Sequence, residues 1–590
     1  FESMIKKSRG KTAVVAIHHP MFSNGPHGGQ YSLKQQLFPF NNYVPLPVLG
    51  SIINLVRKTS GVSNADLQNK KFIELKKRIV TLAQENEKVI MVSGHEHSLQ
   101  YIVEDNIAQI ISGSGSKTSA TRAIGTGEFS YGVHGFARLD IFKDGSSYVR
   151  YFDSDLNVVF EIEVIPPEID LSDQDFSERF PATKNASVYT NAETTKGSLY
   201  QFIWGDRYRT YYSTEVSAPV VDLDTLFGGL VPTRRGGGHQ SNSLRLEDKS
   251  GREYVMRALR KNALQYIQAV AFKDQYVEHQ FDDTYTEDLM LDIFTGSHPY
   301  APFTIARMSD AIGVYHANPV LYYVPKQKAL KQYNDEYGDE LYMIEERVSS
   351  GHGDKASFGF SNKIISTKDM LDKLRKDEQF VIDETAYIRA RLFDMLIGDW
   401  DRHEDQWRWA EFNEEDKTVY RPVPRDRDQA YSIMADGPLL DFLTRIIPEL
   451  RLLHSYKGEL RSPKWFNYEP FPLDMALINQ ADKSVWDEQV TYIQSNITNE
   501  VIEEAFTFFP EEVRDNTIEI IKQKLIERRE NLKAISDEYF VYVNKYGVIK
   551  GTDKDDWFDI ERHPNGETRV TGYRIKNNKK ADVIHDKVYN

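Results

Sequence analysis

The chain has 590 residues, a length that predicts two to four domains at about 150 residues each. Its formal charge of −15, with 88 acidic against 73 basic residues, argues against a general nucleic-acid-binding surface. The complete absence of cysteine excludes disulfides, thiolate metal sites and cysteine nucleophiles. With 40% hydrophobic and 12% aromatic residues, the composition is typical of a folded protein, and no apolar run is long enough to predict a membrane-spanning helix.

The N-terminal part of the chain predicts an α/β layer. Residues 11–17 and 88–92 are short apolar runs rich in β-branched residues, which predict buried strands, and each runs into a histidine-rich turn. Residues 64–87 predict a helix because apolar side chains recur along one face. Residues 101–165 predict further strands separated by turns, so we assign residues 1–165 to a first domain.

The rest of the chain predicts a second, larger domain. We assign residues 166–197 to a linker and 198–540 to a domain with an N-terminal lobe over 198–350 and a C-terminal lobe over 351–540. Residues 367–397 and 498–540 predict strongly helical segments, while 541–590 predict a β-rich tail with a hairpin turn at Asn565-Gly566. The fold class expected is therefore a multidomain α/β and α+β chain.

Histidines follow both strands of the first domain. His18 comes directly after the first strand, and His95 and His97 flank Glu96 in a Gly-His-Glu-His turn after the second. Parallel strands of open α/β sheets place their sites at the carboxyl edge, and imidazole suits zinc, iron or manganese. The alternative is a surface loop that happens to contain histidine, which two such loops in one domain make less attractive.

These motifs, together with Ile111-Ser112-Gly113, resemble calcineurin-like metallophosphoesterases of the purple acid phosphatase branch over residues 10–165. The resemblance implies that His18 and His95 bind one metal ion, that His97 binds a second, and that His27 contacts the substrate phosphate. The implied cofactors are two divalent or trivalent ions (Fe, Zn or Mn), and the implied substrate is a phosphate ester.

That family takes a bridging aspartate and further ligands from motifs that precede the position of His18, and nothing before residue 18 resembles them. We therefore expect residues upstream of Phe1 to complete the site and the chain given to be weak or inactive as a phosphatase. We also expect a further domain beyond Asn590 and, because bacterial relatives are often exported, a periplasmic or cell-envelope location.

A second set of polar residues lies in the larger domain. Asp401 follows an apolar helix, Gln406 comes five residues later, and Asp426 and Asp428 follow a predicted hairpin. Phosphoryl transfer needs one carboxylate to orient the attacking hydroxyl and others to hold magnesium, and this spacing provides both. The alternative is a charged surface loop.

Over residues 225–535 this pattern resembles atypical kinase-like families, namely the spore-coat CotH proteins, the HipA group and the secretory-pathway kinases. The resemblance implies that Asp401 is the catalytic base and that Gln406, Asp426 and Asp428 hold magnesium, with ATP as the nucleotide. Residues implied to contact the nucleotide are Gly236, Gly237, Gly238, Arg257 and Glu345.

Two residues depart from that kinase pattern. Gln406 replaces the usual asparagine, and Arg257 stands where a lysine is expected; the partner glutamate of that lysine is either Glu278 or Glu287. A nucleotide-binding pseudokinase, or a cell-envelope scaffold without catalysis, is therefore the alternative to an enzyme.

Overall fold

The computed structural model describes residues 1–29 except 9, residue 67, residues 69–83, residue 86, residues 88–167 except 105, 106, 124 and 126, and residues 176–236, 241–263 and 285–589. Three residues implied to belong to the kinase-like site, Gly237, Gly238 and Glu278, lie outside the described residues. The side chain of Glu287 lies outside them as well.

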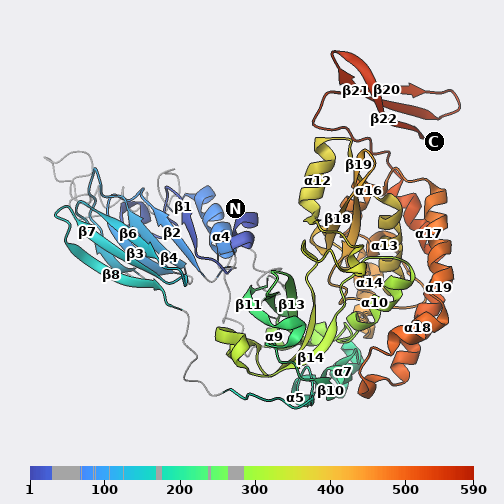
Figure 1. Cartoon of the computed structure of the whole chain (residues 1–590), viewed down its shortest axis with the longest axis horizontal. Coiled ribbons are helices and arrows are strands. Elements are labelled where there is room, and N and C mark those ends of the chain that lie inside the picture. Colours follow the sequence, from blue (N-terminus) through green and yellow to red (C-terminus); the bar gives the residue numbers. More distant parts are fainter. Residues whose placement is uncertain are drawn as a thin grey trace.

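The N-terminal domain is built on a five-stranded sheet in the order β1-β2-β4-β3-β5 (Figure 1). The strands are β1 (Ala13–Ala16), β2 (Val89–Ser93), β3 (Leu99–Glu104), β4 (Ile107–Ser112) and β5 (Gly127–Tyr131). Its helical segments are α1 (Glu2–Ser8), η1 (Pro26–Gly28) and α4 (Lys70–Ala83). The predicted strands at 11–17 and 88–92 are confirmed, and they pair in parallel, so their following loops share one sheet edge.

A second sheet packs on the first. It consists of β6 (Gly135–Ile141), β7 (Ser147–Asp153) and β8 (Val158–Ile165). Because side chains alternate along a strand, Ile90 of β2 joins the core that contains Val149 and Tyr151 of β7, whereas Val89 and Met91 join the core shared with the helices. The result is a layer of helices, a mixed sheet and an antiparallel sheet, consistent with the α/β layering expected.

Part of the segment that we expected to be a linker is folded. Residues 183–186 form β9 (Thr183–Ala186), which pairs antiparallel with β10 (Val216–Pro219), and a short helix, α5 (Asn191–Thr194), follows. The side chain of Thr190 accepts from Glu193 N and the Glu193 carboxylate accepts from Thr190 N, a capping box that fixes where this helix starts. The second domain therefore begins before residue 198, and the linker prediction was wrong for residues 183–194.

The smaller lobe of the second domain is a five-stranded antiparallel sheet in the order β11-β12-β13-β15-β14. Its strands are β11 (Leu230–Arg235), β12 (Ser241–Asp248), β13 (Glu253–Lys261), β14 (Val320–Val324) and β15 (Glu340–Glu346). Short helices before and around this sheet are α6 (Ser198–Trp204), α7 (Arg209–Ser213), η2 (Leu226–Gly228), α9 (Tyr285–Phe294), α10 (Pro302–Ala311), η3 (Lys328–Tyr333), α11 (Asn334–Tyr337) and η4 (Ala356–Phe358). One face of the sheet has its own core, which includes Leu244, Met256 and Ile344.

The larger lobe is mostly helical and surrounds a four-stranded sheet in the order β16-β18-β19-β17 (Figure 1). The strands are β16 (Ile364–Ser366), β17 (Phe380–Ile382), β18 (Trp407–Glu414) and β19 (Lys417–Pro424). The helices are α12 (Thr367–Lys376), α13 (Glu384–Ile397), η5 (Glu404–Gln406), α14 (Pro438–Ile446), η6 (Pro448–Leu453), α15 (Pro463–Phe466), α16 (Phe471–Ile478), α17 (Lys483–Asn496), α18 (Asn499–Phe506), η7 (Glu511–Val513) and α19 (Asn516–Val543). The two-lobed architecture expected is confirmed.

The two long helical predictions need correction. Residues 367–397 are not one helical segment, because β17 interrupts them and pairs in parallel with β19. Residues 498–540 are divided between α18 and α19 by the turn around Pro510, which has no N–H to continue a helix.

The β-rich tail is confirmed as a three-stranded antiparallel sheet. It contains β20 (Asp556–Arg562), β21 (Thr568–Lys576) and β22 (Lys579–Tyr589). The turn predicted at Asn565-Gly566 joins the first two strands, and Gly566 has φ +97°, a backbone conformation that favours glycine. Among the described residues, no helix combines the length and apolar character needed to cross a bilayer.

Candidate functional site between the lobes

The loop that carries Asp401 is held by the end of a buried helix. Most residues of α13 from Tyr387 to Ile397 are buried, and the helix ends at Gly398, whose N–H donates to Asp394 O over 2.9 Å. Gly398 has φ +78°, and a β-carbon there would lie 2.6 Å from the ring of Tyr456. Only glycine fits this position, so the direction in which the Asp401 loop leaves the helix is fixed.

The β18–β19 hairpin brings the two halves of the site together. Trp407 pairs with Pro424, so that Gln406 and Arg425, the residues just outside the paired strands, are neighbours. Arg425 N donates to Gln406 O over 2.9 Å, and Arg402 Nη1 donates to Arg425 O over 2.6 Å. Antiparallel pairing thus places the loop with Asp426 and Asp428 beside the loop with Asp401.

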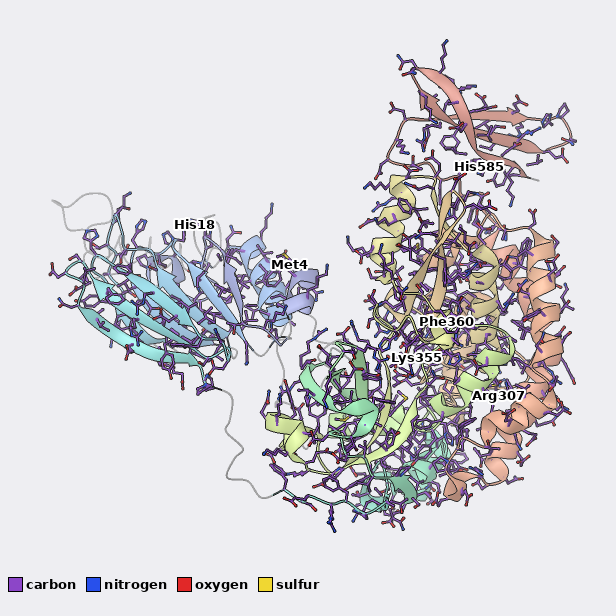
Figure 2. The ribbon with its side chains drawn as sticks, in the orientation of Figure 1. Met4, His18, Arg307, Lys355, Phe360 and His585 are labelled. Carbon is purple, nitrogen blue, oxygen red and sulfur yellow. The ribbon has the colours of Figure 1, made fainter. Side chains whose placement is uncertain are left out.

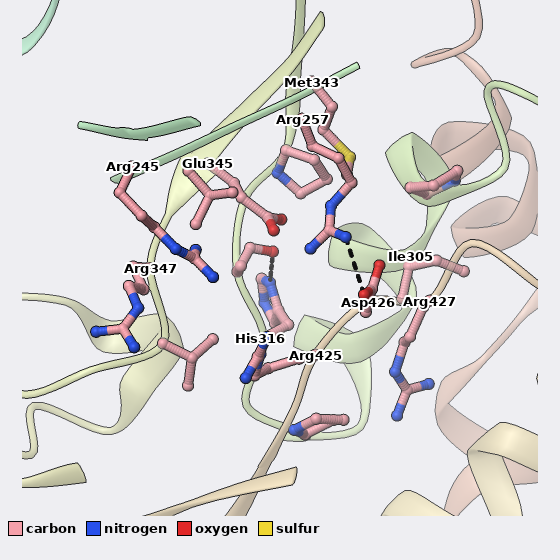
Figure 3. A pocket seen from close by; sticks show the side chains of 16 residues that line it. Arg245, Arg257, Ile305, His316, Met343, Glu345, Arg347, Arg425, Asp426 and Arg427 are labelled. Atoms are coloured by element: carbon pink, nitrogen blue, oxygen red, sulfur yellow. Dashed lines mark hydrogen bonds and ion pairs between the residues drawn. The ribbon is translucent and has the colours of Figure 1, made fainter. Parts of the chain in front are cut away.

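Two cations on one strand meet the carboxylates of this loop. Arg257 Nη1 lies 3.0 Å from Asp426 Oδ2 (Figure 3), and Lys261 Nζ lies 2.5 Å from Asp428 Oδ2. Both cations are on β13, four residues apart, and therefore on the same side of the sheet. Asp426 has φ +57°, which sets its backbone apart from the extended β19 before it.

Sequence analysis did not identify Lys261. The available signal was its spacing from Arg257, because residues separated by an even number along a strand face the same way. Lys261 is itself buried, and its contact with Asp428 places a lysine at the site four residues after Arg257, the position where the kinase pattern leads us to expect one.

The ionisation of the site reflects burial and crowding. Burial, followed by the charges of Asp428 and Asp426, raises the pKa of Asp401 to about 7. Burial also acts to raise the pKa of Asp426, but Arg257 and the other neighbouring cations outweigh it and hold that pKa below its ordinary value. Burial raises the pKa of Glu345, on β15, to about 7 although Arg257 opposes the shift. A group whose pKa lies near neutrality is suited to accept a proton at physiological pH.

One buried carboxylate supports both loops. Asp394, in α13, accepts from Arg391 Nη1 over 2.5 Å and lies 2.8 Å from Arg427 Nη2 and 3.6 Å from Arg402 Nε. Arg402 belongs to the Asp401 loop and Arg427 to the Asp426 loop, so a single side chain ties them to the same helix. Asp394 and Arg391 are fully buried, and a buried carboxylate needs several partners of this kind.

Gly236 directly follows β11 and lies close to Ser243 of β12. Its N–H donates to Ser243 O over 2.6 Å, and a β-carbon there would come within 1.9 Å of Ser243 Oγ. A larger residue at this position would force the Ser243 side chain to move, while the phosphate contact implied for Gly236 stays a prediction.

Histidines of the N-terminal domain form a separate group. His18, labelled on that domain in Figure 2, has Nε2 3.2 Å from His95 Nδ1, and the ring of His19 stacks on His95 with 3.9 Å between centroids. The ring of His27 lies 4.2 Å from that of His95. Among the described residues, His18, His19 and His95 are the one set of three potential metal ligands with ligand atoms within 4.8 Å of one another.

This histidine group fits one metal ion better than two. Three imidazoles suit a single zinc, iron or manganese ion. His97, which the resemblance assigns to a second ion, is not in the compact group, whereas His19, which it does not assign, is. Burial, and then the neighbouring His18 and His27, lower the pKa of His19, which keeps this imidazole neutral and able to coordinate.

The carboxylate nearest in sequence to these histidines has a supporting role that sequence analysis missed. Glu96 is fully buried, and its Oε1 accepts from Ser23 Oγ over 2.7 Å, from His27 N over 2.8 Å and from Gly28 N over 3.2 Å. Glu96 therefore fixes the loop that carries His27 against the turn that carries His95. The only hint in the sequence was a charged residue between two histidines.

No protein-family model matches the chain, and no curated protein matches it. Several solved structures are similar to the chain, and three of them each match about half of it. HipA of Shewanella oneidensis MR-1, in a complex with HipB and operator DNA, is 12% identical over 53% of this chain and 67% of its own, with a TM-score of 0.25. The proinflammatory kinase CtkA of Helicobacter pylori is 10% identical over 51% of this chain and 94% of its own, with a TM-score of 0.26. The third structure is the Rio2 kinase of Chaetomium thermophilum in an ADP/Mg²⁺-phosphoaspartate complex. It is 11% identical over 53% of this chain and 71% of its own, with a TM-score of 0.20.

Proposed function

We propose that the two-lobed domain is a kinase-like module that binds a nucleotide such as ATP together with magnesium and transfers phosphate slowly or not at all. The observation that carries the proposal is the pairing of two cations of β13 with two carboxylates of the loop after β19, beside Asp401. Carboxylate oxygens are the ligands that magnesium prefers, and cations beside them suit phosphate oxygens.

The same contacts support slow transfer. Asp426 Oδ2 is paired with Arg257, so a magnesium ion would have to displace a guanidinium that is itself largely enclosed. Arginine holds a carboxylate with a planar fork, while lysine offers a compact charge that can shift between carboxylate and phosphate. Asp401 would orient an acceptor hydroxyl, and Gln406 would contact the magnesium side.

A thermal-shift titration with ATP and MgCl₂ tests binding, because a ligand that binds only the folded state stabilises it by RT ln(1 + [L]/Kd). We expect Mg-ATP to raise the melting temperature of the wild-type chain more than ATP alone does, and we expect this extra effect of magnesium to be lost in Asp428→Asn. Asp372→Asn, the same change at an exposed ion pair of α12, is the matched control and should respond as the wild type does. An absence of any Mg-ATP response in the wild type would favour a scaffold without nucleotide.

A second function rests on the histidine group. We infer that the N-terminal domain binds a metal ion and takes part in hydrolysis of a phosphate ester, since His18, His19 and His95 converge at the carboxyl edge of parallel strands. When bound, the metal would supply a nucleophilic water of lowered pKa. Release of phosphate from p-nitrophenyl phosphate by the zinc-loaded or manganese-loaded chain, at the low rate expected of this chain and lost in His95→Ala, would support it. A cell-envelope location is likewise a proposal, which fractionation of the source cell would test.

A further inference from the structure

A pocket in the same cleft is lined by an unusual number of arginines. Figure 3 shows it between β12, β13, β15 and the loop after β19. Its charged and titratable lining residues are Arg245, Arg257, Arg347, Arg425, Arg427, His316, Glu345 and Asp426. Five guanidiniums thus face two carboxylates, in a chain whose overall charge is strongly negative.

Three of the five arginines are neutralised locally. Arg257 pairs with Asp426 at 3.0 Å, Arg427 lies 2.8 Å from Asp394, and Arg347 donates to Glu253, which lies outside the pocket lining. His316 is held by Asp310, with 2.9 Å between Nε2 and Oδ1.

The other two arginines have no such partner. The side chains of Arg245 and Arg425 make no ion pair or hydrogen bond within the described part of the chain. Burial, and then the neighbouring Arg347, Arg425 and Arg257, hold the pKa of Arg245 well below its ordinary value. Burial, and then Arg408, lower the pKa of Arg425 to about 9. Guanidiniums in proteins stay charged, so Arg245 and Arg425 are partly buried cations that no direct ion pair within the described residues neutralises, although Asp426 and Glu345 act on Arg425 through their charge.

The size and the donors of the pocket indicate what it accepts. Its volume is about 40 Å³, well below the roughly 300–1,000 Å³ of clefts that enclose whole small molecules. A single tetrahedral anion is of a suitable scale, and the arginine fork matches phosphate oxygens two at a time. Apolar side chains such as Ile305 and Met343 form another part of the wall and would favour a base instead, so the two ligand types need direct comparison.

We propose that Arg245 and Arg425 bind a phosphate group at this end of the cleft, so that the module recognises a polyphosphate ligand by its anionic groups without requiring a purine base. The inference rests on the proposed function for the magnesium end of the cleft, where Asp426 and Asp428 lie. Two sources of this phosphate fit the site, the bound nucleotide or polyphosphate itself and a separate phosphate ion, and the titrations below distinguish them.

The test uses the full chain with inorganic phosphate, tripolyphosphate, ATP and adenosine as probes in calorimetric titrations, each with and without MgCl₂. We expect tripolyphosphate to bind and adenosine not to bind. Arg245→Gln and Arg425→Gln should each weaken tripolyphosphate binding by about tenfold or more, since each removes charge-assisted hydrogen bonds. Arg445→Gln, at an exposed ion pair of α14, is the control and should bind as the wild type does. Binding of inorganic phosphate alone, with the same loss in both variants, would identify a separate phosphate ion as the source.

A stability measurement separates a ligand-binding role from a structural one. Because Arg245 is a partly buried charge that makes no ion pair within the described residues, Arg245→Gln should leave the melting temperature of the ligand-free chain unchanged or raise it, whereas loss of a structural arginine would lower it. Unchanged tripolyphosphate binding in both variants, or tight binding of adenosine, would overturn the inference. If ATP binding by the wild type does not depend on magnesium, but tripolyphosphate binds and is weakened by Arg245→Gln, the result would contradict the proposed function and leave this inference intact.

Discussion

Lys261 Nζ lies 2.5 Å from Asp428 Oδ2, and this contact joins the sheet of the smaller lobe to the loop after β19 in the larger one. Lys261 is buried, so the pair is shielded from solvent on the lysine side, and the interaction is stronger than that of an exposed ion pair. The contact therefore marks the place where both lobes would meet a bound phosphate.

Replacing Lys261 should weaken nucleotide binding. Lys261→Met keeps most of the apolar stem but removes the charge, so we expect Mg-ATP to bind about tenfold or more weakly, the size expected for a lost charged hydrogen bond. Calorimetric titration would measure the affinity. Lys368→Met, at an exposed position of α12, is the control, and equal affinities for the two variants would exclude Lys261 from the site.

Restoring the kinase-type residues should increase phosphate transfer. Arg257→Lys would loosen the ion pair with Asp426. Gln406→Asn would restore the shorter amide that the kinase resemblance places on the magnesium side. We expect the double variant to hydrolyse ATP or to phosphorylate itself faster than the wild type in a radiolabel assay. Arg445→Lys should have no effect. If the double variant is no faster, the ion pair between Arg257 and Asp426 does not limit phosphate transfer.

The pKa of Glu345 predicts a pH dependence of stability. Its folded-state pKa of about 7 lies above the ordinary value of 4.5, so the folded state binds the proton more tightly than the unfolded state does. The stability contributed by protonated Glu345 is therefore fully present below about pH 4.5 and is lost as the pH rises through about 7. The change in the free energy of unfolding is up to about 3 kcal/mol.

Urea unfolding of the wild type and of Glu345→Gln at pH 5 and pH 8 measures this contribution. The variant should lose less stability than the wild type between the two pH values. An identical pH dependence in both proteins would mean that Glu345 does not titrate in this range.

The histidine group predicts which residues hold a metal ion. Because His19 belongs to the compact set and His97 does not, His19→Ala should weaken zinc binding more than His97→Ala does. Competition with a fluorescent zinc chelator would measure both affinities, with His134→Ala as a control outside the group. The reverse order would favour the ligand assignment implied by the metallophosphoesterase resemblance.

Regular local patterns were predictable from the sequence. The strands before His18 and His95, the β-rich tail and its Asn565-Gly566 turn follow from side-chain alternation and turn chemistry, and they were confirmed. The segment at 367–397 was misjudged, because the three residues of β17 are fixed by pairing with β19, a contact that a local pattern does not contain.

The site was predictable only in part, for the same reason. The spacing of Asp401, Gln406 and Asp426 pointed to one loop cluster, and the β18–β19 hairpin explains why they are neighbours. Lys261 and Arg245 were missed because their significance depends on what faces them across the cleft, and that is set by the packing of two lobes.

The most direct test of the account is a calorimetric titration of the wild-type chain with ATP in the presence and absence of MgCl₂, repeated with Asp428→Asn. We predict saturable ATP binding that is stronger with magnesium, and we predict that Asp428→Asn loses this magnesium dependence. An absence of ATP binding by the wild type at millimolar concentrations, or an equal magnesium dependence in Asp428→Asn, would contradict it.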